Sequence, residues 1–244
     1  MRYLVISDIH ANLAALEAVL AAAEPFDAVW CLGDIVGYGP QPNECVERVQ
    51  SLPGLLCLAG NHDWGALGKL SLADFNSEAR WAAEWTGRQL TPANRAWLDG
   101  LPERIEHGDL TLVHGSPRHP IWEYIFNGAV AGESFAHFRT LACLVGHSHI
   151  PLAFQEPGRQ HAEAPGRVRG PGESVSYRPI RAIINPGSVG QPRDGDPRAS
   201  YALLDPEAAT VEYHREPYPI EETQERMHDA GLPPRLAVRL SYGL

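Results

Sequence analysis

The stretch Arg2-Tyr3-Leu4-Val5-Ile6-Ser7-Asp8-Ile9-His10 is the most informative one for the architecture, because an unbroken apolar run ends there in two side chains that can bind a cation. Such a run is typical of a strand buried on both faces. An Ala- and Leu-rich segment then predicts a helix over 12–23, and a second apolar run, 28–32, ends at Gly33-Asp34. This alternation indicates a mixed α/β sheet with right-handed crossovers.

The following segments continue the alternation of strands and helices. A helix is expected over 42–51, where Pro42 stands near the first turn, and a strand over 55–59 leads to Gly60-Asn61-His62-Asp63. Residues 64–101 predict a helical insertion. Further strands separated by turns are expected at 103–107, 109–113, 141–145, 152–155, 180–184, 201–204 and 211–215. The Gly-, Pro- and Arg-rich stretch 157–172 predicts a mobile loop, and 219–230 predicts a terminal helix.

Composition favours one acidic domain. Because 244 residues can bury one sizeable core, we expect a single domain over 1–244. The formal net charge of −10 argues against duplex nucleic acid or an anionic membrane as a partner, since both are bound through clustered Lys and Arg. No apolar run approaches the roughly 18 residues of a membrane span, and Asp8 interrupts the only possible signal-peptide core, so a cytoplasmic protein is expected. The cysteines are expected to be buried and reduced: Cys31, Cys45, Cys57 and Cys143.

Five short polar strings follow strand-like runs, and they carry the chemistry of the chain. They are Asp8-Ile9-His10, Gly33-Asp34, Gly60-Asn61-His62-Asp63, His114-Gly115 and Gly146-His147-Ser148-His149. Open α/β sheets build their sites in loops outside the carboxyl ends of strands, which is where these strings stand. Carboxylate, amide and imidazole ligands together, without a thiolate, indicate a two-metal hydrolytic centre.

In this order the five strings resemble the calcineurin-like metallophosphoesterases, whose pattern is D-x-H, G-D, G-N-H-D/E, H and G-H-x-H. The strings Gly33-Asp34-Ile35-Val36-Gly37-Tyr38-Gly39 and Asn185-Pro186-Gly187-Ser188 are similar to the small bacterial and archaeal phosphoesterases of that superfamily. The resemblance implies a four-layer α-β-β-α sandwich of two mixed β-sheets flanked by helices, with the Asn185–Ser188 turn beside the metals. One metal would take Asp8, His10, Asp34 and His149. The other would take Asp34, Asn61, His114 and His147.

This ligand set suits Mn²⁺, Fe, Zn²⁺ or Ni²⁺, with Mn²⁺ expected to serve in vitro. Two such ions about 3.5–4 Å apart can clamp a phosphate oxygen and lower the pKa of a bridging water towards 7, and the resulting hydroxide would attack phosphorus in line. By resemblance, His62 is the expected general acid for the leaving oxygen. Asp63 would orient His62 or, as an equally open alternative, support the ligands or cap a helix.

Other polar and aromatic side chains are weaker candidates. Three side chains in loops are candidates for contact with phosphate, although most such groups are solvated: Arg118, His119 and Arg193. Three rings are candidates to stack on a nucleobase, although core packing or a subunit contact is the more common role: Trp122, Tyr124 and Phe126. A subunit contact through these rings would form a homo-oligomer, and this alternative stays open.

The second string departs from that of the superfamily's protein Ser/Thr phosphatases, G-D-x-V-D-R-G. Gly37 stands where they carry the Asp that orients the catalytic His, and Tyr38 stands where they carry a phosphate-binding Arg. We expect the less cationic pocket to suit a phosphodiester, with its one negative charge, better than a monoester dianion. In addition, Ala11 stands where relatives often carry Gly, which leaves the local backbone path open.

We therefore expect a metal-dependent phosphoric ester hydrolase that cleaves phosphodiester bonds of a small or nucleotide-like substrate. A phosphomonoesterase or protein phosphatase and a diadenosine-tetraphosphate hydrolase are the alternatives. A nuclease is disfavoured because the chain has no basic stripe. A non-catalytic scaffold with the same fold would be expected to lack ligands, whereas the set here is complete.

Overall fold

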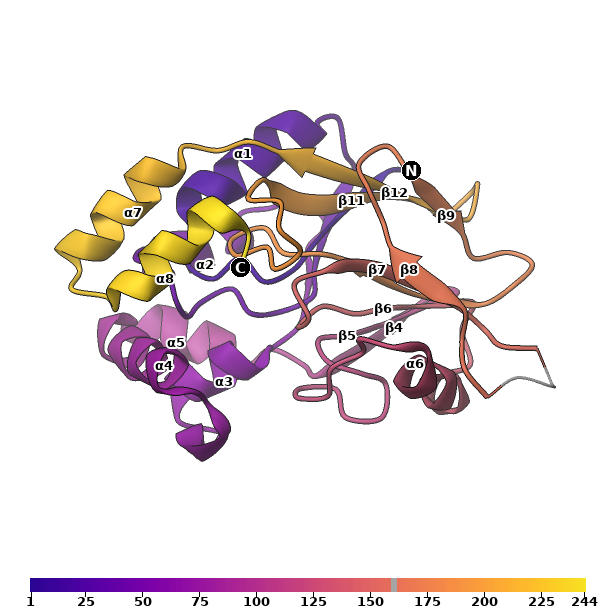
Figure 1. The fold of residues 1–244 in the computed structure, drawn as a ribbon, viewed down its shortest axis with the longest axis horizontal. Helices are drawn as coiled ribbons and strands as arrows, with labels where there is room; N and C mark the ends of the chain where they lie inside the picture. The colour runs from indigo at the N-terminus through magenta and orange to yellow at the C-terminus, as the bar shows by residue number, and fades with distance from the viewer. Residues whose placement is uncertain (159–161) are drawn as a thin grey trace.

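Two six-stranded β-sheets face each other in the computed structural model, which describes residues 1–158 and 162–244 (Figure 1). The first has the order β3-β2-β1-β11-β12-β9, formed by Leu56–Cys57, Ala28–Cys31, Tyr3–Ile6, Ala199–Asp205, Thr210–Glu216 and Ser174–Ser176. The second has the order β4-β5-β6-β10-β7-β8, formed by Arg104–His107, Leu110–Val113, Ala142–Leu144, Ala182–Pro186, Pro151–Gln155 and Gly166–Val168. Both sheets are mixed, because β1 is parallel to β2 and antiparallel to β11, and β10 is parallel to β6 and antiparallel to β7.

Helices cover the outer faces of both sheets and one end of the sandwich (Figure 1). The α-helices are α1 (Leu13–Ala23), α2 (Pro42–Gln50), α3 (Asn61–Leu67), α4 (Ser77–Gln89), α5 (Pro92–Asp99), α6 (Gly128–Ser134), α7 (Ile220–Asp229) and α8 (Pro234–Val238). Three 3₁₀ turns are η1 (Leu72–Asp74), η2 (Phe135–His137) and η3 (Arg239–Tyr242).

The alternation of side chains along the strands fixes the layers. In β1, Leu4 and Ile6 pack in one hydrophobic cluster with α1 and α2, whereas Val5 belongs to the cluster between the two sheets. In β6, Cys143 packs with Phe135 on the outer face, while its neighbour Leu144 faces the first sheet. The order of layers is therefore α1 and α2, first sheet, second sheet, then α6 with η2.

A fourth hydrophobic cluster joins the C-terminal helices to the edge of the sandwich. It contains Ala79 of α4, Met227 of α7 and Leu236 of α8, and it includes Tyr38 from the loop after β2. In Figure 1, α8 lies between α7 and α4. The chain's last helices are thus anchored beside a loop that carries one of the five polar strings.

The α-β-β-α sandwich expected from the resemblance is confirmed, and its helices and strands lie near the expected ranges. Three helices were not expected: α3, which begins at Asn61 inside a polar string, the Gly-containing α6, and the short α8, which follows the expected terminal helix. Of the expected loop 157–172, residues 166–168 form β8 and residues 159–161 lie outside the described residues, so its mobility stays a prediction. Among the described residues, no helix combines the length and apolarity of a membrane span.

Candidate metal centre

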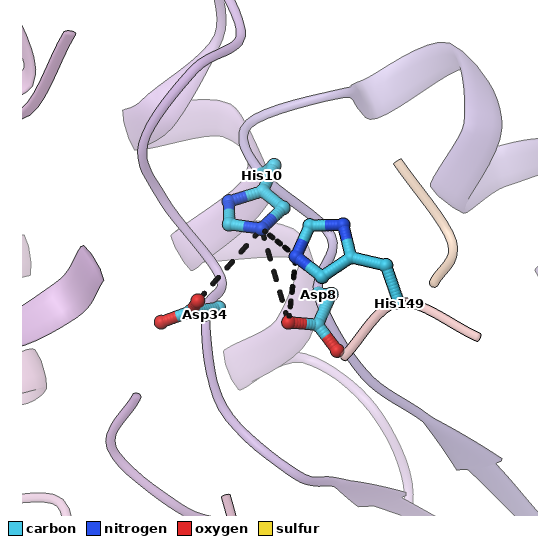
Figure 2. A group of neighbouring side chains, drawn as sticks. All are labelled: Asp8, His10, Asp34 and His149. Carbon is cyan, nitrogen blue, oxygen red and sulfur yellow. Dashed lines mark hydrogen bonds and ion pairs between the residues drawn. The ribbon is translucent and has the colours of Figure 1, made fainter. Parts of the chain in front are cut away.

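The side chains of the five polar strings converge at one end of the sheets, in the loops after β1, β2, β3, β5 and β6. All seven predicted ligands are buried. Their ligand atoms form two groups in which every atom lies within 4.8 Å of the others: Asp8, His10, Asp34 and His149, and Asp34, His114 and His147. Figure 2 shows the first group, in which the carboxylates and imidazoles point toward one another.

Asp34 belongs to both groups through a single oxygen. Its Oδ1 accepts a hydrogen bond from the backbone N–H of His62 at 2.8 Å, while Oδ2 has no hydrogen-bond partner. Oδ2 lies 3.7 Å from His10 Nε2 and 3.3 Å from His114 Nε2. One carboxylate oxygen therefore faces both groups from the end of β2.

The two carboxylate oxygens of Asp8 also differ in their contacts. Its Oδ2 accepts a hydrogen bond from the backbone N–H of His147 at 3.1 Å, and its Oδ1 has no hydrogen-bond partner although it is buried. That free oxygen lies 3.2 Å from His149 Nε2. In each carboxylate, then, a backbone amide fixes one oxygen and leaves the other directed at the centre.

Backbone carbonyls set the tautomers of the four histidine ligands. The N–H of each ring donates to a carbonyl: His10 Nδ1 to Val36 (3.1 Å), His114 Nδ1 to Leu32 (2.8 Å), His149 Nδ1 to Gln191 (2.6 Å) and His147 Nε2 to Trp122 (3.0 Å). The second nitrogen of each ring is left with a lone pair, as in metal-bound histidines whose other nitrogen is held by the protein. The Nε2 atoms of His10 and His149 lie only 3.0 Å apart.

These features fit a divalent cation. Converging lone pairs and buried carboxylate oxygens without donors are unfavourable by themselves, and a cation satisfies both. Asn61 completes the second group, because its Oδ1 lies 3.1 Å from His114 Nε2. The donor atoms are imidazole nitrogens and carboxylate or amide oxygens, which suit transition-metal ions.

The protonation states also suit metal binding, which requires neutral imidazoles and ionised carboxylates. Burial lowers the pKa of His147 to about 3. Burial would raise the pKa of Asp8 and Asp34, but neighbouring histidines outweigh it and hold both below the usual range. His114 is the exception: burial lowers its pKa, but the Asp34 carboxylate more than reverses this and the value rises to about 10. A positive charge is thus stabilised beside Asp34.

The backbone of the centre is strained. Residues other than glycine with positive φ include Asp8 (54°), His10 (50°), Asp34 (54°), His147 (64°) and His149 (61°). Such left-handed conformations cost free energy in residues with a Cβ and cluster at functional sites. Ala11, at φ 52°, also lies in this region, which glycine adopts at lower cost.

The Asp63 carboxylate accepts hydrogen bonds from backbone N–H groups rather than from the His62 ring. Its Oδ2 accepts hydrogen bonds from the N–H groups of Asp34 (2.9 Å) and Gly60 (2.8 Å), and its Oδ1 accepts one from Val36 (3.1 Å). It thereby joins the loop after β2 to the first turn of α3. Burial and the charge of Asp34 raise the pKa of Asp63 to about 7. Of the two roles left open by the sequence, this geometry favours structural support.

His62 lies beside the first group but outside it. Its ring centroid is 4.9 Å from that of His10, and the rings of Tyr38 and Phe75 lie at 4.4 and 5.0 Å. Its buried Nδ1 has no hydrogen-bond partner. A Cβ on Gly37 would lie 2.8 Å from that nitrogen, so the glycine makes room for the ring and excludes an aspartate at this position.

The Asn185–Ser188 turn lies beside the centre, as the resemblance implied. Asn185 Nδ2 donates to the carbonyl of Gly146 (2.6 Å) and to Ser148 Oγ (3.0 Å). Ser188 Oγ donates to the carbonyl of Asp8 at 2.8 Å. The turn therefore fixes the backbone of two ligand loops.

The weaker candidates separate into two sets. Arg118 is ion-paired with Glu123 and Glu133, and His119 is exposed, so neither is directed at the centre. Arg193 does reach it, as its Nη2 donates to the hydroxyl of Tyr38 at 3.4 Å. An arginine distant in sequence, one of the three candidates, thus lies on the side where the local string carries Tyr38 in place of an arginine.

The aromatic candidates line the second group. The carbonyl of Trp122 holds His147, and the Tyr124 ring stacks on His147 with a centroid distance of 3.7 Å. Phe126 stacks in turn on Tyr124 at 4.9 Å. The side chain of Phe126 is 51% exposed and that of Tyr124 is 38% exposed, so the stack leaves aromatic surface open beside the centre.

Comparisons with known proteins agree with this geometry. The family model of the calcineurin-like phosphoesterase superfamily domain matches residues 1–209. An uncharacterised protein of Methanocaldococcus jannaschii is 41% identical over an alignment of 246 residues, and the alignment covers 98% of this chain and 97% of that protein. The crystal structure of a metallophosphoesterase from Sphaerobacter thermophilus has 52% sequence identity and a TM-score of 0.91, covering 100% of this chain and 99% of that one.

A more distant structure shows the fold alone. A hypothetical protein from Pyrococcus horikoshii has a TM-score of 0.82 at 20% identity, covering 100% of this chain and 98% of its own. The family match covers most of the chain, and the two relatives described first have much higher identity. These matches show membership of a family as well as a shared fold. The chain therefore belongs to the calcineurin-like phosphoesterase superfamily and is a metal-dependent phosphoric ester hydrolase.

Proposed function

We propose that the chain hydrolyses phosphodiester bonds of a small or nucleotide-like substrate at a centre of two divalent cations. The observation that carries this proposal is the position of Asp34 Oδ2, which faces the histidines of both ligand groups. One cation would be held by Asp8, His10, Asp34 and His149, and the other by Asp34, Asn61, His114 and His147. Mn²⁺ is the ion proposed for activity in vitro, with Fe, Zn²⁺ and Ni²⁺ compatible with the same donors.

Two cations held there would polarise the phosphoryl oxygens and supply a nucleophile from water near neutral pH. The protein contributes the positions of the donor atoms, which are fixed by the carbonyls and amides described above. It also contributes His62, placed on the first turn of α3 by the bond from its N–H to Asp34. We assign to His62 the donation of a ring N–H to the leaving oxygen during in-line displacement, and to Asp63 support of the backbone that carries Asp34.

The surroundings of His62 support a diester. The ring is enclosed by Tyr38, Phe75 and the backbone of Gly37, and no carboxylate is bonded to it in the described part of the chain. A phosphate that carries two organic groups suits such an aromatic wall. The exposed Tyr124–Phe126 stack offers a similar surface to an organic group on the other side. Phosphomonoester hydrolysis and diadenosine-tetraphosphate hydrolysis remain the alternatives.

The test is an assay of metal-stripped protein with Mn²⁺ restored, using bis-p-nitrophenyl phosphate and p-nitrophenyl phosphate. Diester cleavage should exceed monoester cleavage. It should fall by at least about 100-fold in His62→Ala, which removes the proposed general acid, and in Asp34→Asn, which alters the carboxylate that faces both ligand groups. His228→Ala is the matched control, because His228 is exposed on α7. Faster monoester cleavage would replace the diester proposal, and full activity in Asp34→Asn would refute the site.

A further inference from the structure

A cavity of about 180 Å³ opens between the two sheets at the end opposite the metal centre. Aromatic rings from distant parts of the chain line it: Tyr3 of β1, Trp30 of β2, His107 of β4 and Tyr177, which follows β9. Trp30 and Tyr177 belong to the hydrophobic cluster between the sheets, whereas His107 is exposed. This space, the rim cavity, is therefore an opening of the inter-sheet core toward solvent.

The rim cavity lies where β1 begins, and the metal ligand Asp8 follows the other end of the same strand. From Tyr3 to Asp8 the chain advances by five residues, from position 3 to position 8. At about 3.3 Å per residue, this places the cavity on the order of 16 Å from the centre. The residues of β1 between them, 4–6, are all buried. A compound in the rim cavity is thus separated from the metal ligands by packed core, and the cavity is not part of the substrate site.

The walls of the rim cavity are rigid aromatic surfaces. The Tyr3 ring stacks on Trp30 with a centroid distance of 4.6 Å, and the His107 ring meets the Trp30 ring edge to face at 5.4 Å. Aromatic rings attract one another in these geometries at centroid distances of about 4.5–7 Å. The walls therefore favour another flat aromatic ring over a saturated group of equal size.

Two buried side chains of the cavity carry hydrogen-bond donors that the protein does not use. Trp30 and Tyr177 are each 2% exposed, yet neither the indole N–H nor the Tyr177 hydroxyl donates to another group in residues 1–158 and 162–244. By contrast, the buried hydroxyl of Tyr213 donates to the carbonyl of Leu152 at 2.9 Å. Because a buried donor without an acceptor is unfavourable, an acceptor atom on a ligand in the cavity would be stabilised there.

The charges around the rim cavity favour a neutral ligand. The lining residue Asp109 is ion-paired with Arg178 at 2.5 Å, so that guanidinium already has a counter-ion. Among the described residues that line the cavity, there is no lysine or arginine. With a formal net charge of −10 on the protein, nothing here compensates the desolvation of an anionic ligand.

We propose that the rim cavity binds a neutral compound with a single aromatic or heteroaromatic ring that carries a hydrogen-bond acceptor, such as a carboxamide. The size agrees with this class, because an apolar cavity of about 150 Å³ is known to hold benzene. The aromatic walls select the ring, and the unused donors of Trp30 and Tyr177 select the acceptor. This second site is independent of the hydrolytic function proposed above.

The test is a titration of the Zn²⁺-loaded full-length protein with benzamide, followed by the amide chemical shifts in NMR. The shifts should saturate with a Kd on the order of 1 mM, as expected for so small a ligand, and should be largest at 107–110 and at Tyr177. Tyr177→Phe removes only the hydroxyl and should raise Kd about twofold to tenfold. His107→Ala should raise it by about the same factor through loss of the ring contact. His137→Ala is the matched control, because His137 is exposed on η2, and it should leave Kd unchanged.

Two related compounds test the chemistry of the ligand. Cyclohexanecarboxamide has the same carboxamide without an aromatic ring, and it should bind at least about threefold more weakly than benzamide. Benzoate has the same ring with a negative charge and should also bind more weakly. The assignment would be overturned by the absence of saturable shifts, by equal binding of all three compounds, or by an unchanged Kd in both Tyr177→Phe and His107→Ala. Largest shifts at Asp34 and His147 would equally overturn it, since they would place benzamide at the metal centre.

Discussion

Replacing Asp63 by Asn should destabilise the fold and weaken metal binding together, because the carboxylate holds three buried backbone N–H groups. An asparagine can keep the two bonds made by Oδ2 but turns an amide donor toward the N–H of Val36, which loses its acceptor. A buried unsatisfied amide costs about 1–3 kcal/mol, and loss of the charge weakens the remaining bonds. Relief of the repulsion between Asp63 and Asp34 offsets part of this loss.

The expected net effect is a decrease of about 2 kcal/mol in the free energy of unfolding. Urea denaturation of metal-stripped protein measures it without any contribution from bound ions, and the midpoint should fall by about 0.7–1 M. The affinity for Mn²⁺ should fall by about 10–100-fold, as for other residues that support metal ligands. Asp74→Asn is the control, because Asp74 is exposed on η1.

A catalytic role for Asp63 would give a different pattern. If Asp63 acted by orienting His62, the Asn variant would keep the urea midpoint and the Mn²⁺ affinity of the wild type and would lose only kcat. That combination would refute the assignment of Asp63 to the backbone. A fall in all three quantities is the outcome that the three hydrogen bonds predict.

Three further substitutions or treatments test other parts of the structure. Gly37→Ala should lower kcat at least about tenfold while the metal content is retained. The reason is that the added Cβ would press on His62 Nδ1, and that the backbone φ of +91° is unfavourable for alanine. A normal kcat would show that catalysis does not depend on the position of His62. Asn185→Ala should lower Mn²⁺ affinity about 10–100-fold by freeing the Gly146–Ser148 backbone, as measured by calorimetry, and unchanged affinity would contradict that support role. All four cysteines are buried and unpaired, and burial raises the pKa of the Cys143 thiol to about 12; Ellman's reagent should therefore label none in native protein and all four in guanidinium, and rapid native labelling would contradict the burial.

The sequence predicts the first half of the molecule well because its information there is local. Each parallel strand is an unbroken apolar run, and each run ends near a polar residue that can bind a cation. Arg2–His10 shows both features, and β1 with its left-handed Asp8 lies where they indicate. The candidate ligands are predicted for the same reason, since strand ends on one edge of a sheet must lie near one another.

The remaining features depend on contacts between distant residues, for which no local pattern exists. The helix α6 contains two glycines and is stabilised by the Asn127 cap and by packing of Ala131 and Phe135 on the second sheet. Tertiary packing therefore overrides a low helix propensity. Arg193 is a similar case: its place beside Tyr38 follows from the pairing of β10 with β6, and a loop arginine carries no such information by itself.

The centre and its scaffold place opposite demands on the chain. Left-handed residues, carboxylate oxygens without donors and imidazole nitrogens 3.0 Å apart all raise the free energy of the folded state. Two large hydrophobic clusters on either face of the first sheet offset these costs and allow the donor atoms to be held in place. The same strain directs the lone pairs to common points. Substitutions that relieve it should therefore raise the free energy of unfolding and lower the affinity for cations. Cation binding at this site therefore depends on a rigid scaffold, and that scaffold would be more stable without the strained site.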